Sequence, residues 1–226
     1  MKLTVYNGSG RGKRGNSAIL IDAFIKGFSS MEGCSSEVFI LMEKDALEQA
    51  TRAFPSAEHV LLVFPMYTDT VPGIVKDFIE RLAPYRGRQG NPAIGFIIHC
   101  GFPEIKQLRA LEAYLKKLTQ RLGCEHTGTV LMGNSEGLRT TSPQQRQGLI
   151  DTFETLGKSY AQRGCMDQEI IKPLAQPERF SGLMLLVFKL LSFTPFINTG
   201  WNKTLKVNGA YEKRFAQPYL DGDENA

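Results

Sequence analysis

The sequence predicts an α/β protein built on a doubly wound sheet of five parallel strands, and three observations support this fold class. Short apolar runs alternate with longer segments of helical periodicity over residues 1–165, which is the pattern of repeated strand–helix–strand units. The run from His59 to Phe64 is apolar throughout after its histidine, as expected for a central parallel strand buried on both faces. The three loops of most unusual composition each follow an expected strand, at the edge where such sheets bind ligands.

The period of the apolar residues and the residues that end each run place the individual elements. We expect strands at residues 3–6, 37–41, 59–64, 93–99 and 124–132. We expect helices at residues 16–33, 45–54, 73–82, 108–122 and 143–163. Asp45 is expected to cap the second helix, and Ile74, Phe78 and Leu82 to share one face of the third.

Composition and charge exclude several classes of protein. Hydrophobic residues make up 42% of the chain and charged residues 22%, which is typical of a globular protein rather than a disordered one. The formal charge of +4 is mild and the basic residues are not clustered, so we expect no nucleic-acid partner. The four cysteines are scattered without a CxxC pair, which argues against a metal site and indicates a reducing compartment. The strand-like start is too short for a secretory signal, so a cytoplasmic location is expected.

The first loop, residues 7–17, has the composition of a phosphate-binding loop. Its glycines let backbone N–H groups turn inward, its serines add hydroxyl donors, and the helix that follows contributes a positive dipole end. Arg11, Lys13 and Arg14 add positive charge, although not all three can reach one phosphate. The Gly-Lys-Ser/Thr ending of a Walker A loop is missing. The alternative is an ordinary flexible glycine-rich turn.

The second loop, residues 65–73, combines a backbone stiffened by two prolines with a flat ring at Tyr67 and polar groups at Thr68 and Asp69. A planar heteroaromatic ligand needs this combination. The alternative is that Tyr67 only covers the sheet edge while Asp69 or Thr70 caps the next helix.

The third loop, residues 99–104, could close the other side of such a ligand. Gly101 permits close approach of the backbone, and Phe102 could flank a ring. A lone histidine at a strand end, such as His99, is more often a hydrogen-bonded structural group than a catalyst. Cys100 lacks a basic partner beyond its neighbour, so neither residue is assigned a catalytic role.

Taken together, these loops resemble the NAD(P)H-dependent FMN reductase and quinone reductase branch of the flavodoxin-like superfamily, over about residues 1–165. The resemblance is carried by Ser9-x-Arg11 with Asn16-Ser17, and more specifically by Pro65-Met66-Tyr67, Val71-Pro72-Gly73 and residues 76–81. It implies the strand order 2-1-3-4-5, bound FMN, and NADH or NADPH as electron donor. Residues 10–15 carry more glycine and basic residues than the family pattern, and the cysteine cluster of iron–sulfur flavoproteins is absent.

The resemblance also implies three groups of FMN-binding residues. The phosphate group comprises Ser9, Arg11, Gly15, Asn16 and Ser17. The ring-side group comprises Pro65, Met66, Tyr67, Thr68 and Asp69. The group that closes the other side comprises His99, Cys100 and Gly101.

The function implied is hydride transfer from NADH or NADPH through FMN to a small acceptor such as a quinone, a nitro or azo compound, or free flavin. Because the flavin carries the chemistry, no side-chain acid or base is required. The alternative is an electron-carrier flavodoxin that docks on a protein partner. Carriers of that kind are usually short and acidic, whereas this chain is long and mildly basic, so the enzyme is favoured.

Residues 166–226 form an extension beyond this domain, with an apolar helix expected near 182–194. The segment 182–198 falls short of the ~20 residues that span a bilayer. A helix apolar on all sides needs cover on all sides, and packing within the chain or in a homodimer is favoured over a membrane surface. A third hypothesis is a membrane-attached flavoprotein that passes electrons to lipid quinones through this helix. Residues 201–219 are expected not to be helical.

Overall fold

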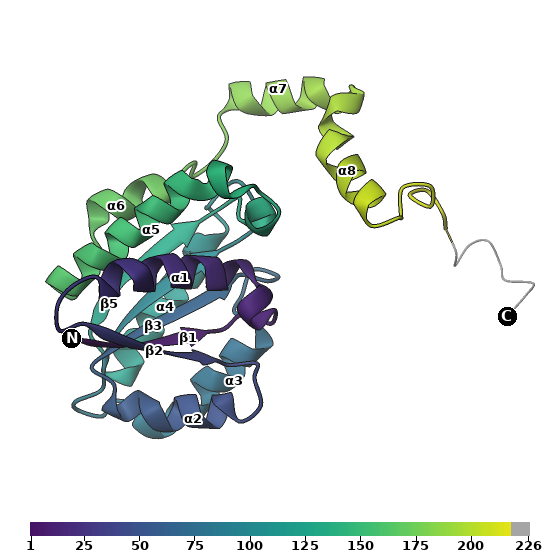
Figure 1. The fold of residues 1–226 in the computed structure, drawn as a ribbon. Helices are drawn as coiled ribbons and strands as arrows, with labels where there is room; N and C mark the ends of the chain where they lie inside the picture. The colour runs from purple at the N-terminus through teal and green to yellow at the C-terminus, as the bar shows by residue number, and fades with distance from the viewer. Residues whose placement is uncertain (218–226) are drawn as a thin grey trace, which may run out of the picture. The chain divides into compact units, whose positions relative to one another are not determined.

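The computed structural model describes residues 1–217, and the chain divides into two compact units between Arg179 and Phe180. The first unit carries the sheet (Figure 1). Its five strands are all parallel and lie in the order β2-β1-β3-β4-β5, which confirms the predicted fold class and strand order. The strands are β1 (Lys2–Asn7), β2 (Ser35–Ile40), β3 (His59–Pro65), β4 (Ala93–His99) and β5 (His126–Met132).

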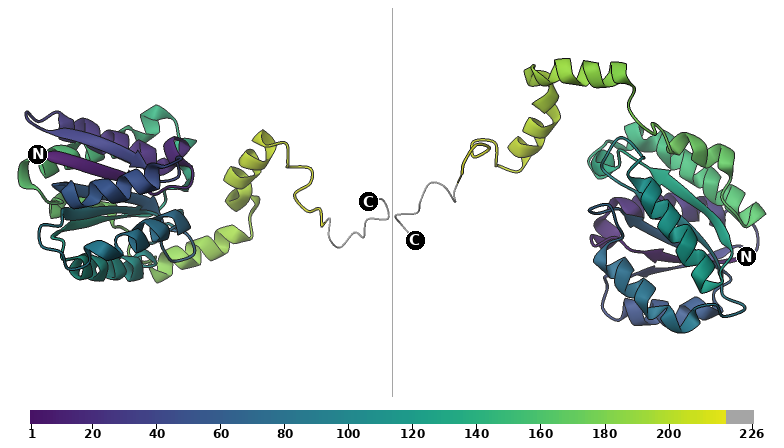
Figure 2. Two further views of the ribbon diagram at one scale, coloured as in Figure 1. Left: turned by 90° about the horizontal axis from the view of Figure 1, so that it is seen from below. Right: turned by 180° about the vertical axis from the view of Figure 1, so that it is seen from behind.

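Helices cover both faces of this sheet (Figures 1 and 2). One face is covered by α1 (Asn16–Ser29), α5 (Pro143–Arg163) and α6 (Gln168–Leu174). The other face is covered by α2 (Ala46–Ala53), α3 (Gly73–Arg81) and α4 (Leu108–Leu122). Short 3₁₀ turns lie at Gly12–Arg14, Phe54–Ser56, Ala83–Tyr85 and Glu136–Arg139.

The central strand β3 is buried on both faces, as its continuous apolar sequence predicts. Val60, Leu62 and Phe64 belong to the core under α2, α3 and α4. Leu61 and Val63 belong to the core under α1 and α5. Because β1 pairs with β2 on one side and β3 on the other, the chain reverses its direction of winding between β1 and β3. The loops after these two strands therefore diverge and leave a crevice at the carboxyl edge of the sheet.

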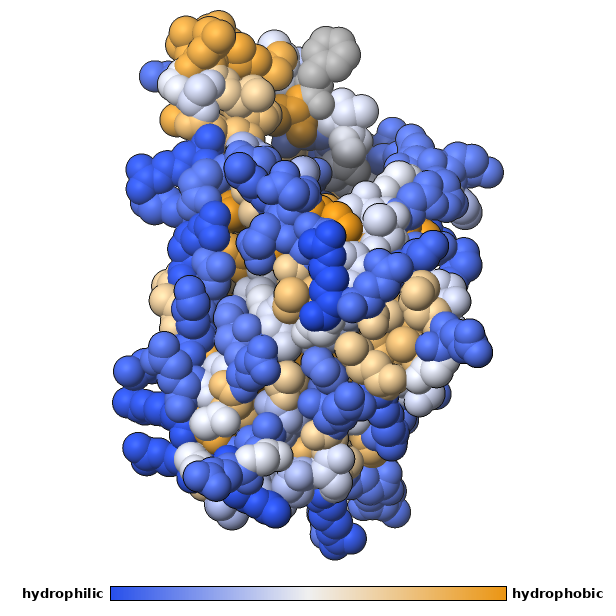
Figure 3. All heavy atoms as spheres, turned by 90° about the vertical axis from the view of Figure 1, so that its left-hand side faces the viewer, coloured by the Kyte–Doolittle hydropathy of each residue, from blue (hydrophilic) through white to orange (hydrophobic). Residues whose placement is uncertain are grey.

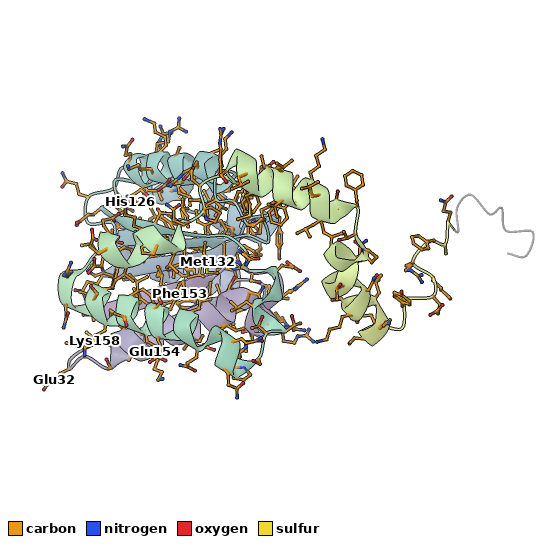
Figure 4. The ribbon with its side chains drawn as sticks, turned by 90° about the horizontal axis from the view of Figure 1, so that it is seen from above. Glu32, His126, Met132, Phe153, Glu154 and Lys158 are labelled. Carbon is orange, nitrogen blue, oxygen red and sulfur yellow. The ribbon has the colours of Figure 1, made fainter. Side chains whose placement is uncertain are left out.

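Two glycines allow α1 and α5 to pack against each other at very short range. A Cβ atom on Gly27 of α1 would lie 1.8 Å from the backbone oxygen of Glu154, and one on Gly157 of α5 would lie 2.0 Å from the backbone oxygen of Phe24. Figure 4 labels Phe153 and Glu154 on this stretch of α5. The Phe153 side chain is fully buried in the core between α5 and the sheet. The contact fixes the position of α1, whose first residue lies at the crevice.

Details of the first unit differ from the sequence-based expectation. Asp45 makes no side-chain cap bond to α2, because its backbone is left-handed with φ at 60°. Helix α6 was not predicted, since it is short and contains Pro173. The compact unit extends past residue 165 because Ile171 of α6 is buried and the Met166 N–H donates to the Thr127 carbonyl at 2.7 Å.

The second unit contains α7 (Gly182–Ser192), a 3₁₀ turn (Pro195–Asn198) and α8 (Thr199–Val207). Helix α7 begins where the apolar run predicts it. The expectation that residues 201–219 are not helical is wrong for the part in α8, where Trp201 and Leu205 share one face at i, i+4 spacing. Residues 218 and 219 lie outside the described range. Within residues 1–217 no helix has both the length and the apolar character needed to cross a bilayer.

The α1–α5 contact predicts opposite effects for two glycine substitutions. Gly27→Ala should lower the free energy of unfolding by about 3 kcal/mol or more, because the new methyl group meets backbone that cannot move aside. Gly148→Ala on α5 is the matched control, since no atom lies within 4 Å of its Cβ position, and should raise stability by about 0.5–1 kcal/mol. Denaturant unfolding measures both. Equal effects of the two substitutions would contradict the packing described.

Candidate functional site

A pocket of about 60 Å³ lies at the carboxyl edge of β1, β3 and β4 and brings together most of the residues predicted from the sequence. All three predicted groups are represented. Its lining includes Ser9, Arg11, Asn16, Pro65, Met66, Tyr67, His99, Cys100 and Gly101. Four predicted residues do not line it: Gly15, Ser17, Thr68 and Asp69.

Two lining residues were missed by sequence reasoning. Ser135 and Glu136 come from the loop after β5, which brings a fourth strand end to the pocket. The available signal was a pair of polar residues soon after a strand. Asn134 and Ser135 come shortly after the end of β5, just as Cys100 and Gly101 come after the end of β4.

The first loop, residues 7–17, is held together by hydrogen bonds between its own residues. The Ser9 N–H donates to Asn7 Oδ1 at 3.0 Å, and the Arg11 N–H donates to Ser9 Oγ at 3.3 Å. The Ser9 carbonyl accepts from the Gly12 N–H at 2.9 Å. These bonds pair several of the backbone donors and acceptors of the loop with partners inside the loop itself.

Helix α1 presents an uncapped N-terminus at the pocket. Its N-cap is Gly15, which has no side chain to bond the free N–H groups of the first turn. A Cβ at this position would lie 2.6 Å from Ser9 Oγ, so only glycine leaves this space open. Free backbone N–H groups and the positive end of the helix dipole together favour an anion.

Only one of the three loop cations lines the pocket. Arg11 does so, whereas Lys13 Nζ lies 3.6 Å from a carboxylate oxygen of Glu43. The Arg14 carbonyl accepts a hydrogen bond from Arg139 Nη1 at 3.0 Å. The structure thus agrees with the expectation that the three cations cannot serve one phosphate.

Asn16 presents an unpaired acceptor. Its Nδ2 donates to the Ser135 carbonyl at 2.6 Å, and this fixes the orientation of the amide because a carbonyl oxygen only accepts. The Asn16 Oδ1 atom is buried and has no hydrogen-bond partner among the described residues. A buried acceptor without a donor is unfavourable, so this atom is suited to a ligand hydroxyl.

The imidazole of His99 joins three loops through buried hydrogen bonds. Its Nε2 lies 2.8 Å from Ser17 Oγ on α1, and its Nδ1 lies 2.9 Å from Ser135 Oγ after β5. Ser135 Oγ in turn donates to the Cys100 carbonyl at 2.9 Å. Since Ser135 has only one hydroxyl hydrogen, Nδ1 must carry the ring proton and Nε2 must accept from Ser17. His99 and Ser17 thus support the pocket, and Ser17 does so without lining it.

Burial keeps the site's histidine and cysteine uncharged. Desolvation lowers the pKa of His99 to about 4 and raises the pKa of the Cys100 thiol above its ordinary value. At neutral pH His99 is therefore a neutral imidazole and Cys100 a thiol. Neither is poised as a base or a nucleophile.

The ring-side loop contains a strained two-residue turn. Tyr67 and Thr70 exchange backbone hydrogen bonds of 3.2 and 3.1 Å, and both residues between them are left-handed, with φ of 48° at Thr68 and 59° at Asp69. A β-branched residue rarely adopts this conformation, which costs on the order of 1–3 kcal/mol. Helix α3 has Pro72 as its N-cap with no side-chain cap bond, so the interpretation of Asp69 or Thr70 as caps is wrong.

A larger hollow of about 470 Å³ lies beside the site and shares Ser135 with it. It is formed by the loop after β5 and the start of α5, and it contains none of the predicted residues. Gln145, Arg146 and Leu149 line it from α5.

Comparison with known proteins supports the fold described above. No protein-family model matches the sequence, and a sequence comparison with curated proteins finds no match. Solved structures do resemble the chain, and they share its flavodoxin-like α/β fold. The structures described below are each less than 25% identical to this chain, so the likeness is one of fold.

Three of these structures cover most of the chain. An FMN-dependent NADH-azoreductase from Bacillus anthracis, in complex with FMN, is 14% identical over 71% of this chain and 100% of its own, with a TM-score of 0.56. An NAD(P)H:quinone oxidoreductase from Methanothermobacter marburgensis is 14% identical over 70% and 96%, with a TM-score of 0.54. RosB, with a bound formylated flavin phosphate, is 11% identical over 86% and 88%, with a TM-score of 0.53.

The neutral, buried state of His99 predicts a pH dependence of stability. Its pKa is about 4 in the folded protein and near 6.5 when unfolded, so the unfolded state takes up the proton first as the pH falls. The contribution of His99 to the free energy of unfolding should be complete above pH 6.5. It should fall by about 3 kcal/mol as the pH declines toward 4. Urea unfolding at several pH values measures it.

His99→Gln should remove most of this pH dependence, whereas His126→Gln, at a less buried histidine, should retain it. An unchanged pH profile in His99→Gln would show that the ring is not the titrating group.

Proposed function

We propose that this protein is an FMN-dependent oxidoreductase that takes hydride from NADH or NADPH and passes it to a small acceptor. The observation that carries the proposal is the pocket at the carboxyl edge of β1, β3 and β4. It combines the N-terminus of α1, which is suited to bind an anion, with the loops of residues 65–73 and 99–104, which are suited to a planar ring.

The chemistry of the pocket fits the phosphate end of FMN. Ser9, Arg11 and the free N–H groups at the start of α1 are donors for a phosphate. The space beside Gly15 and Ser9 is one that a Cβ would fill. The unpaired Asn16 Oδ1 needs a hydroxyl donor of the kind that a ribityl chain carries.

The ring of the flavin fits the open rim rather than the closed part of the pocket. The closed volume of about 60 Å³ is far below the ~300–1,000 Å³ of typical ligand sites. The exposed ring of Tyr67 and the backbone of Gly101 border the rim, and both are suited to flank a planar group. We therefore assign the ring-side loops to the isoalloxazine.

The chain's own residues would bind and orient the cofactor, and bound FMN would supply the hydride-accepting and hydride-donating centre. The left-handed turn at Thr68 and Asp69 holds the Tyr67 segment in one conformation. The His99 hydrogen bonds hold the start of α1 against the end of β4 and the loop after β5. No charged acid or base is required from either His99 or Cys100.

The names of the structural neighbours support the same assignment, since the Bacillus anthracis protein is an FMN-dependent NADH-azoreductase and the Methanothermobacter marburgensis protein an NAD(P)H:quinone oxidoreductase. The acceptor proposed for this chain is accordingly a quinone, an azo or nitro compound, or free flavin. The second candidate remains an electron carrier that docks on a protein partner.

Cofactor binding is testable with a pair of arginine variants. The purified protein should bind FMN and quench its fluorescence, and Arg11→Gln should weaken binding at least about tenfold because a charged donor to the phosphate is lost. Arg14→Gln is the matched control, since Arg14 belongs to the same loop but does not line the pocket. The same loss of FMN affinity in both variants would show that the net charge of the loop matters rather than a contact of Arg11. No fluorescence quenching by the native protein would refute the proposal.

The enzyme and the carrier differ in their reaction with nicotinamides. When NADH or NADPH is added without oxygen to the FMN-bound protein, the visible flavin absorbance should bleach, and a quinone or azo dye should restore it. An FMN-loaded protein that neither nucleotide bleaches would favour the carrier.

A further inference from the structure

Among residues 180–217, the second unit exposes an apolar helix, α7, whose Phe188 ring contacts the ring of Phe180 at 5.1 Å between ring centres. Eight of the eleven residues of α7 are large and apolar, and none of its residues is buried. Leu183 at one end is 73% exposed, and Phe193 just after the other end is 80% exposed. In Figure 3 the hydrophobic colour gathers over α7, while polar and charged side chains cover most of the visible face of the first unit.

The residues after α7 add cations and aromatic rings. Between residues 180 and 217 the sequence has five basic residues and one acidic residue; the acidic residues near the chain end, at 221, 223 and 224, lie outside the described range. The Lys206 ammonium lies 4.8 Å from the centre of the Tyr211 ring, and the Arg214 guanidinium lies 3.9 Å from the same ring. Trp201 is 66% exposed. Basic residues mixed with exposed aromatic rings are suited to the headgroup region of an anionic bilayer.

The length of α7 suits one leaflet of a membrane. Eleven residues at about 1.5 Å each make a helix of about 16 Å, roughly half of the ~30 Å hydrocarbon core. Its single charged residue, Lys189, has a side chain long enough to place its ammonium at the headgroups while the stem stays in apolar surroundings.

The first unit of the chain, in this copy or a second one, offers little to cover this helix. The first unit has few large apolar side chains that are exposed, and these are Val38, Met42, Tyr67, Phe102 and Tyr114. Of these, Tyr67 lines the candidate site and Phe102 borders it. A contiguous apolar face as large as that of α7 has no counterpart among them.

From these observations we infer that residues 180–217 dock the protein on an anionic membrane surface, with α7 entering one leaflet and the basic residues around α8 facing the lipid headgroups. The inference concerns the second unit and does not depend on FMN binding by the first. An acceptor dissolved in the same membrane would then be concentrated near the protein.

The test is flotation of the full-length protein with vesicles of phosphatidylcholine alone or with added phosphatidylglycerol. The protein should float with the anionic vesicles, and high salt should weaken this binding. The variant Leu186→Glu/Leu190→Glu should lose at least about tenfold in vesicle affinity, because charges resist entry into the hydrocarbon. Tyr114→Glu, at an exposed ring on α4, is the matched control and should float normally.

A second pair of variants isolates the charge. Lys203→Gln/Lys206→Gln should weaken binding to anionic vesicles about tenfold, whereas Lys116→Gln/Lys117→Gln on exposed positions of α4 should not. Failure of the native protein to float, or flotation unaffected by Leu186→Glu/Leu190→Glu, would overturn the inference. So would a lipid-free dimer, seen by light scattering, that this double variant dissociates, because α7 would then be a subunit interface.

Discussion

The two hydrogen bonds to the His99 imidazole hold the candidate site in one arrangement. They join Ser17 at the start of α1 to Ser135 after β5, and Ser135 continues to the carbonyl of Cys100 after β4. The ring is almost fully buried and uncharged, so loss of either partner would leave a buried polar group unpaired at a cost of about 1–3 kcal/mol. A helix end and two loops from distant parts of the sequence therefore keep a fixed relation to one another around the pocket.

The packing of α1 on α5 supports this arrangement from the other end of the helix. With Gly27 and Gly157 at the crossing, the two backbones lie closer together than any residue with a Cβ atom would allow. The start of α1 is thus fixed twice, once by backbone contact and once by the Ser17–His99 bond. An anion site made from backbone N–H groups depends on such fixing, because the dipoles act only while they point at the ligand.

The sequence predicts the sheet well because a buried parallel strand such as β3 has a continuous apolar run and each helix has a clear period. It also predicts most of the pocket, since polar loops after strands meet at one edge. Ser135 and Glu136 were missed because their loop has neither the prolines nor the aromatic residue that distinguish residues 65–73. Helix α6 and the end of the first unit depend on contacts of Met166 and Ile171 with β5, which local patterns do not contain. The roles of the lining residues toward a ligand stay predictions.

The direction of the hydrogen bonds around His99 has a consequence for proton movement. Each hydrogen in the series points the same way, from Ser17 to the ring, from the ring to Ser135, and from Ser135 to a backbone carbonyl. A backbone carbonyl is not basic enough to take up a proton and pass it on, so the series ends there. A proton that a bound molecule gains or loses therefore has no path to solvent along this series of hydrogen bonds.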